Sequence, residues 1–394
     1  MSIDLLQVKG VKCSSIASGI KKNNILDLSL ISLSKGSSTA AVFTQNIFCA
    51  APVIVSKNHV NSNIEALLIN SGNANAGTGE RGLEDCYNTC VYLAEELEIK
   101  PEQVLPFSTG VIGEFLPLEA FKSNVNILVS SLSKNGMSKV ANGILTTDLV
   151  EKSYSTSINI GGKTVTLSGV AKGSGMIRPD MATMLSFIVS DISASKEELQ
   201  DCLTHAVNQS FNRITVDGDT STNDACSLSA TNQSGVQLSQ CKGEFQKALN
   251  LVSKKLAQMI VKDGEGATKF VEIKIEGLES SEDCLEVAYT IAHSPLVKTA
   301  LFAGDANWGR ILAAVGRAKV NGVSIENIDI YINGLQIIVS GEKSSTYTEE
   351  LGSAEMQKSE IIIRVNLGTT SLSESVWTTD LSYDYVKINA EYRS

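Results

Sequence analysis

The chain has 394 residues, which is long for one compact core and favours two domains or one large α/β unit. Its formal charge is −10 and no run of Lys or Arg stands out, so we expect no nucleic-acid surface. No apolar run approaches about 18 residues, so the sequence predicts no membrane-spanning helix.

The eight cysteines form no CxxC pair. Residues 1–12 lack the apolar core and small-residue cleavage site of a signal peptide. Scattered thiols without an export signal are typical of reduced cytosolic proteins. We therefore expect a cytoplasmic location.

Along the chain, predicted strands alternate with predicted helices. Helical apolar periodicity covers Leu83 to Leu97 and Phe245 to Met259. The alternation predicts a mixed α/β fold, with a break near residue 180 and a second boundary near residues 277–283. Runs rich in Ile, Leu and Val predict strands at residues 66–69, 164–170, 185–189, 270–275, 327–332 and 360–365.

Several familiar motifs fail on context. Residues 77–82 match GxGxxG, but the first glycine follows the predicted strand by eight residues, so a turn before a helix is favoured over a cofactor site. Residues 217–221 resemble a calcium loop that has Thr222 where glycine is required. None of the three histidines, His59, His205 and His293, lies in HExxH, and we expect no metal.

Residues 172–185, KGSGMIRPDMATML, are the most informative segment. Taken alone, they predict a strand, a glycine loop with Pro179, and a second apolar strand that opens at Ala182 and Thr183. A strand-to-strand connection with a buried threonine is one interpretation. Because histidine is scarce, acyl chemistry in this chain would need another base, and an N-terminal amine is one such base.

The same segment resembles the self-cleavage site of the ornithine acetyltransferase family, in which the chain is cut between Ala and Thr. Six further segments look like family signatures and follow the family's order. They are residues 108–113, 146–148, 212–224, 263–269, 304–310 and 388–394.

This resemblance implies a layered αββα sandwich, of the type shared with self-processing aminopeptidases, and a second C-terminal α/β domain. It also implies cleavage into an alpha chain, residues 1–182, and a beta chain, residues 183–394, with a sub-domain at 280–394. Strands on both sides of the cut are expected to share one core. The family's usual assembly is a heterotetramer of two alpha and two beta chains.

The implied activity is ping-pong transfer of acetyl from acetylornithine to glutamate in the cyclic arginine pathway. Thr183 would cut the bond to Ala182, and its freed α-amine would activate its own hydroxyl. By resemblance, Thr109 and the Gly110 N–H stabilise the oxyanion. A Ser-Thr-Gly turn without catalytic role is the alternative for that pair.

Carried over in the same way, six residues besides Thr183 would bind substrate. Each could alternatively be an ordinary exposed polar residue. No cofactor is expected, and acetyl-CoA stays open as an alternative acetyl donor. The six are Thr146, Thr147, Lys172, Glu265, Asn389 and Ser394.

Three positions depart from the family pattern. Asp180 stands where Asn or a small residue is frequent, Asp148 is followed by Leu149, and the chain ends in Ser394 in place of Thr. Two other hypotheses remain open. One is a self-processing aminopeptidase or amidase that uses water as acceptor, and the other is a binding protein that keeps residues 182–183 joined.

Overall fold

The computed structural model describes residues 5–178 and 184–391. Contacts divide the chain into two compact units, each with its own sheets. The first unit comprises the chain up to Asn212 together with Asp219–Ile260, and the second comprises Arg213–Gly218 and the chain from Val261 onward. The second unit thus begins before residues 277–283, where the sequence suggested a boundary.

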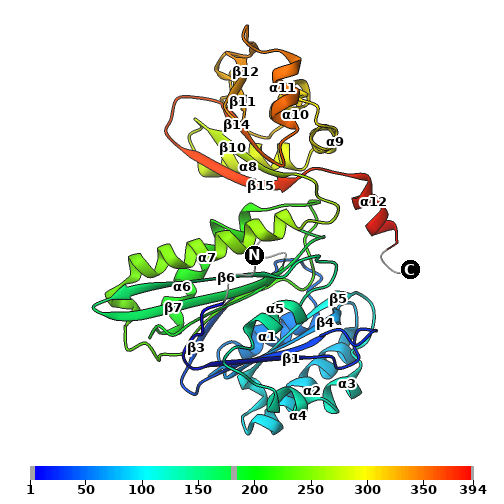
Figure 1. The fold of residues 1–394 in the computed structure, drawn as a ribbon, viewed down its shortest axis with the longest axis vertical. Coiled ribbons are helices and arrows are strands. Elements are labelled where there is room, and N and C mark those ends of the chain that lie inside the picture. Colours follow the sequence, from blue (N-terminus) through cyan, green and yellow to red (C-terminus); the bar gives the residue numbers. More distant parts are fainter. Residues whose placement is uncertain (1–4, 179–183, 392–394) are drawn as a thin grey trace. The chain divides into compact units, whose positions relative to one another are not determined.

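Two sheets form the centre of the first unit (Figure 1). One has the strand order β1-β2-β4-β5, with only β4 and β5 parallel. The other has the order β3-β9-β8-β7-β6, with only β8 and β9 parallel. The strands are β1 (Val11–Ile16), β2 (Leu28–Leu33), β3 (Ser38–Phe43), β4 (Ala66–Asn73), β5 (Val104–Val111), β6 (Lys152–Ile160), β7 (Lys163–Lys172), β8 (Leu185–Ser190) and β9 (Ala225–Ala230).

One hydrophobic cluster contains side chains from both sheets. Leu67 of β4 belongs to it, and the rings of Phe107 and Phe187 meet edge to face with centroids 4.9 Å apart. The next residue of β4, Leu68, points to the opposite face and packs with the helices there. Because β4 is buried on both faces, its sequence is continuously apolar, which made residues 66–69 recognisable as a strand.

Helices cover the outer face of each sheet. Cys90 of α2 and Leu128 of α4 share a core with β2 and β4. On the other sheet, α7 approaches β7 so closely that a Cβ added at Gly169 would lie 2.9 Å from Leu256 Cδ1. The order helix, sheet, sheet, helix confirms the predicted αββα sandwich (Figure 1). The helices are α1 (Ala51–His59), α2 (Gly79–Leu97), α3 (Leu118–Lys122), α4 (Val125–Ser130), α5 (Met137–Gly143), α6 (Lys196–Asn208) and α7 (Lys242–Lys262), with 3-10 turns η1 (Pro101–Gln103), η2 (Phe211–Arg213) and η3 (Leu238–Gln240).

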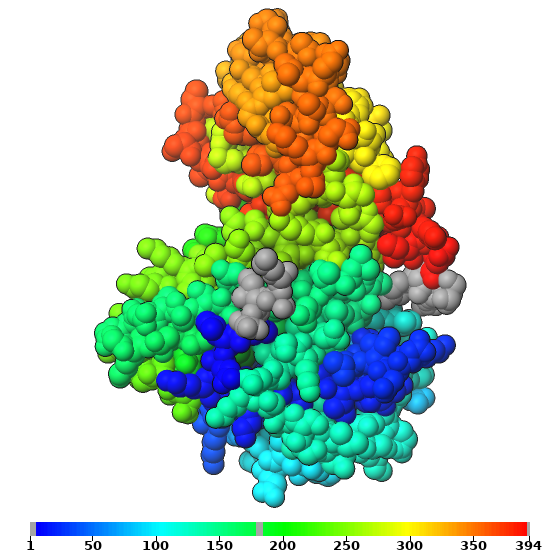
Figure 2. Space-filling view, in the orientation of Figure 1, coloured from blue at the N-terminus to red at the C-terminus, as the bar shows by residue number. Residues whose placement is uncertain are grey.

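The free edge of β1 is covered by the segment before α5. Cys13 N donates to Ser133 O at 2.9 Å, and Ser133 N donates to Cys13 O at 3.0 Å. In Figure 2 the blue N-terminal segment and the blue-green segment around residue 130 lie side by side on the first unit. This bridge satisfies backbone groups that an edge strand would otherwise offer to another chain.

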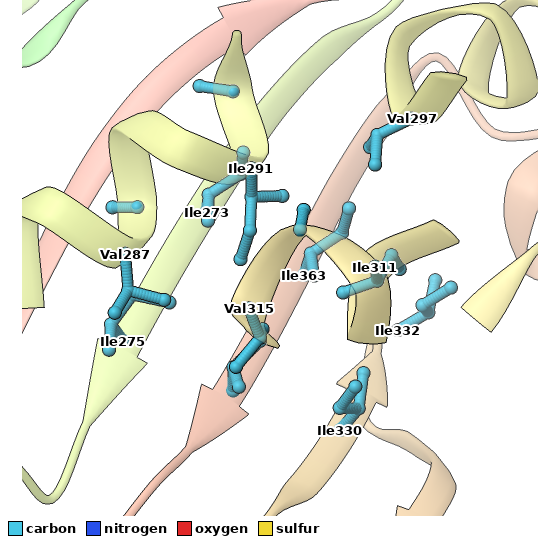
Figure 3. Close-up of a cluster of buried hydrophobic side chains, with 14 of the residues drawn as sticks. Ile273, Ile275, Val287, Ile291, Val297, Ile311, Val315, Ile330, Ile332 and Ile363 are labelled. Carbon is cyan, nitrogen blue, oxygen red and sulfur yellow. The ribbon is translucent and has the colours of Figure 1, made fainter. Parts of the chain in front are cut away.

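The second unit is built on one mixed sheet of strand order β13-β12-β11-β14-β10-β15. Alternate strand residues such as Ile273 and Ile363 point to Ile291 of α8 and Ile311 of α10 (Figure 3). This period-two burial confirms the predicted second α/β domain. Its elements are β10 (Phe270–Glu276), α8 (Ser281–Ala292), α9 (Pro295–Ala303), α10 (Trp308–Gly316), η4 (Ile325–Asn327), β11 (Asp329–Ile332), β12 (Leu335–Val339), β13 (Glu342–Lys343), α11 (Glu349–Met356), β14 (Glu360–Asn366), β15 (Ser373–Thr379) and α12 (Tyr383–Ala390).

The predicted strands and both periodic helices are present. The strand expected over residues 327–332 starts at Asp329, because the residues before it form η4. The GxGxxG match spans the bend before α2 and the first turn of that helix, and Thr78 Oγ1 within it donates to Asn75 Oδ1 at 2.7 Å. Across the described ranges, none of the helices has both the length and the apolar character required to cross a bilayer.

Candidate active site

The predicted oxyanion residues lie at the end of β5, beside the end of β4. Gly110 has φ +135°, and a Cβ added there would lie 2.3 Å from the Gly72 carbonyl carbon. Position 110 therefore accepts only glycine without a backbone shift. Thr109 precedes it and faces Ser71 across the parallel pair. The oxyanion role of both residues stays a prediction.

A buried polar network supports these strand ends. Ser108 Oγ donates to Asn70 Oδ1 at 2.6 Å, and Asn70 Nδ2 donates to Asn73 O at 2.8 Å. Asn223, from the loop before β9, donates through Nδ2 to Ser108 O at 2.9 Å and to Ala74 O at 2.6 Å. Buried polar groups need such partners, so the network fixes the backbone around Gly110. Sequence analysis missed these roles: Asn70 lies near the end of β4, and Asn223 lies in the signature segment 212–224 without an assigned role.

Asp148 joins two of the predicted substrate segments. Its carboxylate accepts from Thr146 N at 2.9 Å and from Gly173 N at 2.7 Å. It also pairs with Lys152 Nζ at 2.6 Å and lies 3.8 Å from Lys172 Nζ. Thr146 and Lys172, predicted from separate motifs, therefore meet at one carboxylate. Thr147 follows in the same half-buried turn.

The charge of Asp148 is stabilised where it is buried. Burial alone would raise the pKa of this carboxyl, but Lys172, Lys152 and the Thr146 N–H outweigh burial and hold the pKa well below its ordinary range. Asp148 is thus an anion, and it partly neutralises the positive charge of Lys172.

The Asp148→Asn variant is expected to be destabilised by about 3–5 kcal/mol, because the fully buried ion pair between Asp148 and the Lys152 ammonium would be broken. Urea unfolding measures the effect. The control is Asp201→Asn, whose carboxylate lies 3.8 Å from Lys242 Nζ with 74% of its side chain exposed. An exposed pair contributes little, so the control should unfold like the parent.

The same variant also tests the acid limb of stability. A carboxyl whose pKa falls on folding contributes stability above its unfolded pKa, about 3.9, and loses that contribution as the pH falls below it. The parent should therefore lose more stability than Asp148→Asn between about pH 5 and pH 3. Equal midpoints for parent and variant at neutral pH would refute the charge-pair argument.

Two further predicted substrate residues meet within the second unit. Asn389 Nδ2, on α12, donates to Glu265 Oε2 at 2.8 Å. The N-terminus of α12 packs on the turn after α7, where Ser382 Oγ donates to Gly266 O at 2.6 Å. Ala182, Thr183 and Ser394 lie outside the described residues.

Asp224 is a buried acid beside the strand that begins after the predicted cut. The next residue, Ala225, donates its N–H to Met184 O at 3.0 Å. Within the described residues, Asp224 Oδ2 has no hydrogen-bond partner. Burial raises the pKa of Asp224 well above its ordinary value. The sequence placed Asp224 in a signature segment without assigning it a role.

Fold and site together define a mixed α/β sandwich with a positive-φ glycine at the end of β5 and, at the end of β7, a lysine that shares Asp148 with the Thr146 turn. The chain belongs to the ArgJ family, whose model matches residues 12–394. This result confirms the predicted family and, with it, the class of acetyltransferase in arginine biosynthesis.

Curated relatives match over nearly the whole chain. The arginine biosynthesis bifunctional protein ArgJ of Pseudomonas syringae pv. tomato is 48% identical over 392 residues, covering 98% of this chain and 97% of the relative. The protein of the same name from Methylococcus capsulatus is 48% identical over 396 residues, covering 100% and 97%.

Solved structures match over parts of the chain. The ArgJ crystal structure from Bacillus halodurans is 41% identical, covers 44% of this chain and 92% of that one, and has a TM-score of 0.42. The Mycobacterium tuberculosis ornithine acetyltransferase complexed with ornithine is 29% identical, covers 46% and 98%, and has a TM-score of 0.41.

Proposed function

We propose that this enzyme transfers acetyl from Nα-acetylornithine to glutamate through an acetyl ester of Thr183. The observation that favours this proposal most is the position of Asp148. It holds Thr146 and Lys172 together and binds Gly173, the first residue of the loop that leads to Thr183. The Asp148 carboxylate therefore links two predicted substrate residues to the start of the predicted cleavage loop.

Self-cleavage comes first in the proposed sequence. Thr183 Oγ attacks the Ala182 carbonyl carbon, the C–N bond breaks, and an ester joins the two residues. Water then hydrolyses the ester, leaving a carboxylate on Ala182 and an α-amine on Thr183. Strands β7 and β8 flank this loop, and Lys172 pairs with Leu185 in the sheet. Both fragments therefore share one sheet and one core, as expected from the sequence, which favours their staying associated.

Acetyl transfer then proceeds in two half-reactions. The Thr183 α-amine, with a reference pKa of about 7.7–8.0, takes the hydroxyl proton as Oγ attacks the acetyl carbonyl. Ornithine leaves with that proton on its amine, and glutamate's amine attacks the ester to give N-acetylglutamate. Thr109 Oγ1 and Gly110 N–H stabilise the oxyanion in both steps.

The substrate residues divide by charge. Lys172 and the hydroxyls of Thr146 and Thr147 suit an α-carboxylate, because an ammonium and hydroxyls can donate to its oxygens. The Glu265 carboxylate, oriented by Asn389, suits the side-chain ammonium of ornithine. Ser394 is proposed to complete this set through its hydroxyl.

The test is a product assay with glutamate present and absent. With both substrates we expect catalytic N-acetylglutamate and an equal amount of ornithine. Without glutamate we expect at most one ornithine per enzyme and an acetyl group on the fragment that begins at Thr183. Continuous ornithine release without glutamate would replace the proposal by an amidase. An uncut chain without turnover would favour the binding-protein hypothesis.

The curated relatives are named bifunctional, which favours a second activity in this chain. The candidate left open by the sequence is acetyl-CoA as the donor in the first half-reaction. Incubating the enzyme with acetyl-CoA and glutamate alone tests it, since N-acetylglutamate then forms only through that activity. We also propose that the enzyme assembles from two alpha and two beta chains. Its proposed location is the cytoplasm.

A further inference from the structure

Lys21 contacts both groups of predicted site residues in the first unit: the strand ends that hold Gly72 and Gly110, and the turn that contains Thr146. It belongs to the loop between β1 and β2, and its ammonium donates to Leu145 O at 2.6 Å and to Leu26 O at 3.2 Å. Leu145 immediately precedes Thr146. The aliphatic stem of Lys21 covers Gly72, where an added Cβ would lie 2.9 Å from Lys21 Cγ.

Gly72 in turn lies against Gly110. The two glycines are paired in the β4–β5 register, and Gly110 leaves no room for a side chain between them. Gly72 therefore contacts both the Lys21 stem and Gly110. The amine of Lys21 reaches from this contact to the turn that contains Thr146.

The charge around Lys21 is incompletely balanced. Within the described part of the chain, Lys21 forms no ion pair, and its two acceptors are neutral carbonyl oxygens. Asp27 is directed to the loop backbone, accepting from Ser18 N at 2.6 Å and from Lys21 N at 2.8 Å. Asp148 is shared by Lys152 and Lys172.

Asp148 lies within 4 Å of both Lys152 and Lys172, whereas the acids that act on Lys21, Asp27 and Asp148, do so without an ion pair among the described residues. Burial lowers the pKa of Lys21 to about 8, Asp27 opposes this shift, and Lys172 adds to it. A half-buried ammonium without a carboxylate partner is a favourable place for an anionic ligand.

We propose that Lys21 is a specificity-determining residue that binds, together with Lys172, the α-carboxylate shared by the acetyl donor and the acetyl acceptor. This inference rests on the proposed function. In both substrates the α-carboxylate is attached to the carbon that bears the reacting nitrogen. Its cation must therefore lie close to the oxyanion residues. The Lys21 stem contacts Gly72, which pairs with Gly110, and its ammonium bonds to Leu145 O beside Thr146, which favours Lys21 for this role.

The test compares two donors that differ only in the α-carboxylate, Nα-acetylornithine and N-acetylputrescine. Lys21→Met keeps the apolar stem and removes the charge. We expect kcat/KM for acetylornithine to fall about 10- to 100-fold, the range for a hydrogen bond to a charged group, and kcat/KM for N-acetylputrescine to stay unchanged. The control, Lys22→Met, alters an exposed neighbour and should change neither value.

The ratio of the two kcat/KM values also has a predicted pH dependence. The ammonium is present below its pKa of about 8, so the parent's preference for acetylornithine should decline above that pH. Titration of the Thr183 amine affects both donors equally and cancels in the ratio. Lys21→Arg, with a guanidinium that stays charged, should keep its preference to higher pH.

Equal losses for both donors in Lys21→Met would mean that Lys21 only supports the fold, and an unchanged ratio would exclude a carboxylate contact. If Lys21→Met does not fold, the pH profile of Lys21→Arg decides, because a decline at the parent's pH would overturn the proposal. A parent enzyme that transfers no acetyl from acetylornithine would refute the proposed function itself, a result distinct from any change in the ratio.

Discussion

Replacing Thr183 by alanine is expected to leave the chain as one species of 42.0 kDa and to abolish acetyl transfer. The variant lacks the oxygen that would attack Ala182 and accept the acetyl group, so both reactions lose their nucleophile. Loss of a nucleophile in hydrolases with an intact oxyanion site lowers kcat by about 10⁴-fold or more. Denaturing mass spectrometry and the glutamate-dependent assay measure the two effects on the same sample.

Two variants separate this chemistry from a general effect of substitution. Thr183→Ser keeps the hydroxyl and should still yield two fragments divided between residues 182 and 183. Thr164→Ala removes an exposed hydroxyl of β7 that donates to Asn159 Oδ1 at 2.9 Å, and it should process and turn over like the parent. A parent chain that stays whole, or a Thr183→Ala chain that is still cut there, would eliminate the threonine mechanism.

The sequence identified central strands rich in Ile, Leu and Val more readily than edge strands. Strands β4, β8 and β10 are flanked on both sides, and their Ile, Leu and Val residues made them evident. Strands β1, β6 and β15 are edges whose sequences contain several Ser or Thr residues, and none of them was predicted. Edge strands face water on one side, so their polar positions resemble those of loops.

The sequence also could not predict how the candidate site residues meet in space. Thr146 and Lys172 were identified by resemblance to a family, one motif at a time. Their meeting at Asp148 depends on β7 returning along β6, which places Lys152 opposite Ala171. A motif states which residues occur in order along the chain, whereas a shared carboxylate is a property of the folded sheet.

The polar network under Gly110 was also invisible in the sequence. Asn70, Ser108 and Asn223 come from three segments that pairing of β4 with β5 and packing of the two sheets bring together. Each residue alone is consistent with an ordinary turn. Only burial requires that their amides and hydroxyls satisfy one another.

Gly110→Ala is expected to lower kcat about 10²- to 10³-fold. The folding of the second unit, which does not contain Gly110, should change little. The new Cβ would lie 2.3 Å from the Gly72 carbonyl carbon and 2.6 Å from Asn73 N, so β4 and β5 must separate. That movement displaces the Gly110 N–H and the Thr109 hydroxyl from the proposed oxyanion. Steady-state kinetics on protein whose cleavage has been verified by mass spectrometry measures the loss.

Gly113→Ala is the matched control. Gly113 has φ +88°, so alanine there carries a backbone cost of about 1–2 kcal/mol, as it also does at Gly110. An added Cβ at Gly113, however, meets nothing within 4 Å. Both variants should therefore lose stability in urea, whereas only Gly110→Ala should lose kcat. Equal kcat for the two variants would show that the close approach at Gly110 serves folding alone and that the oxyanion is stabilised elsewhere.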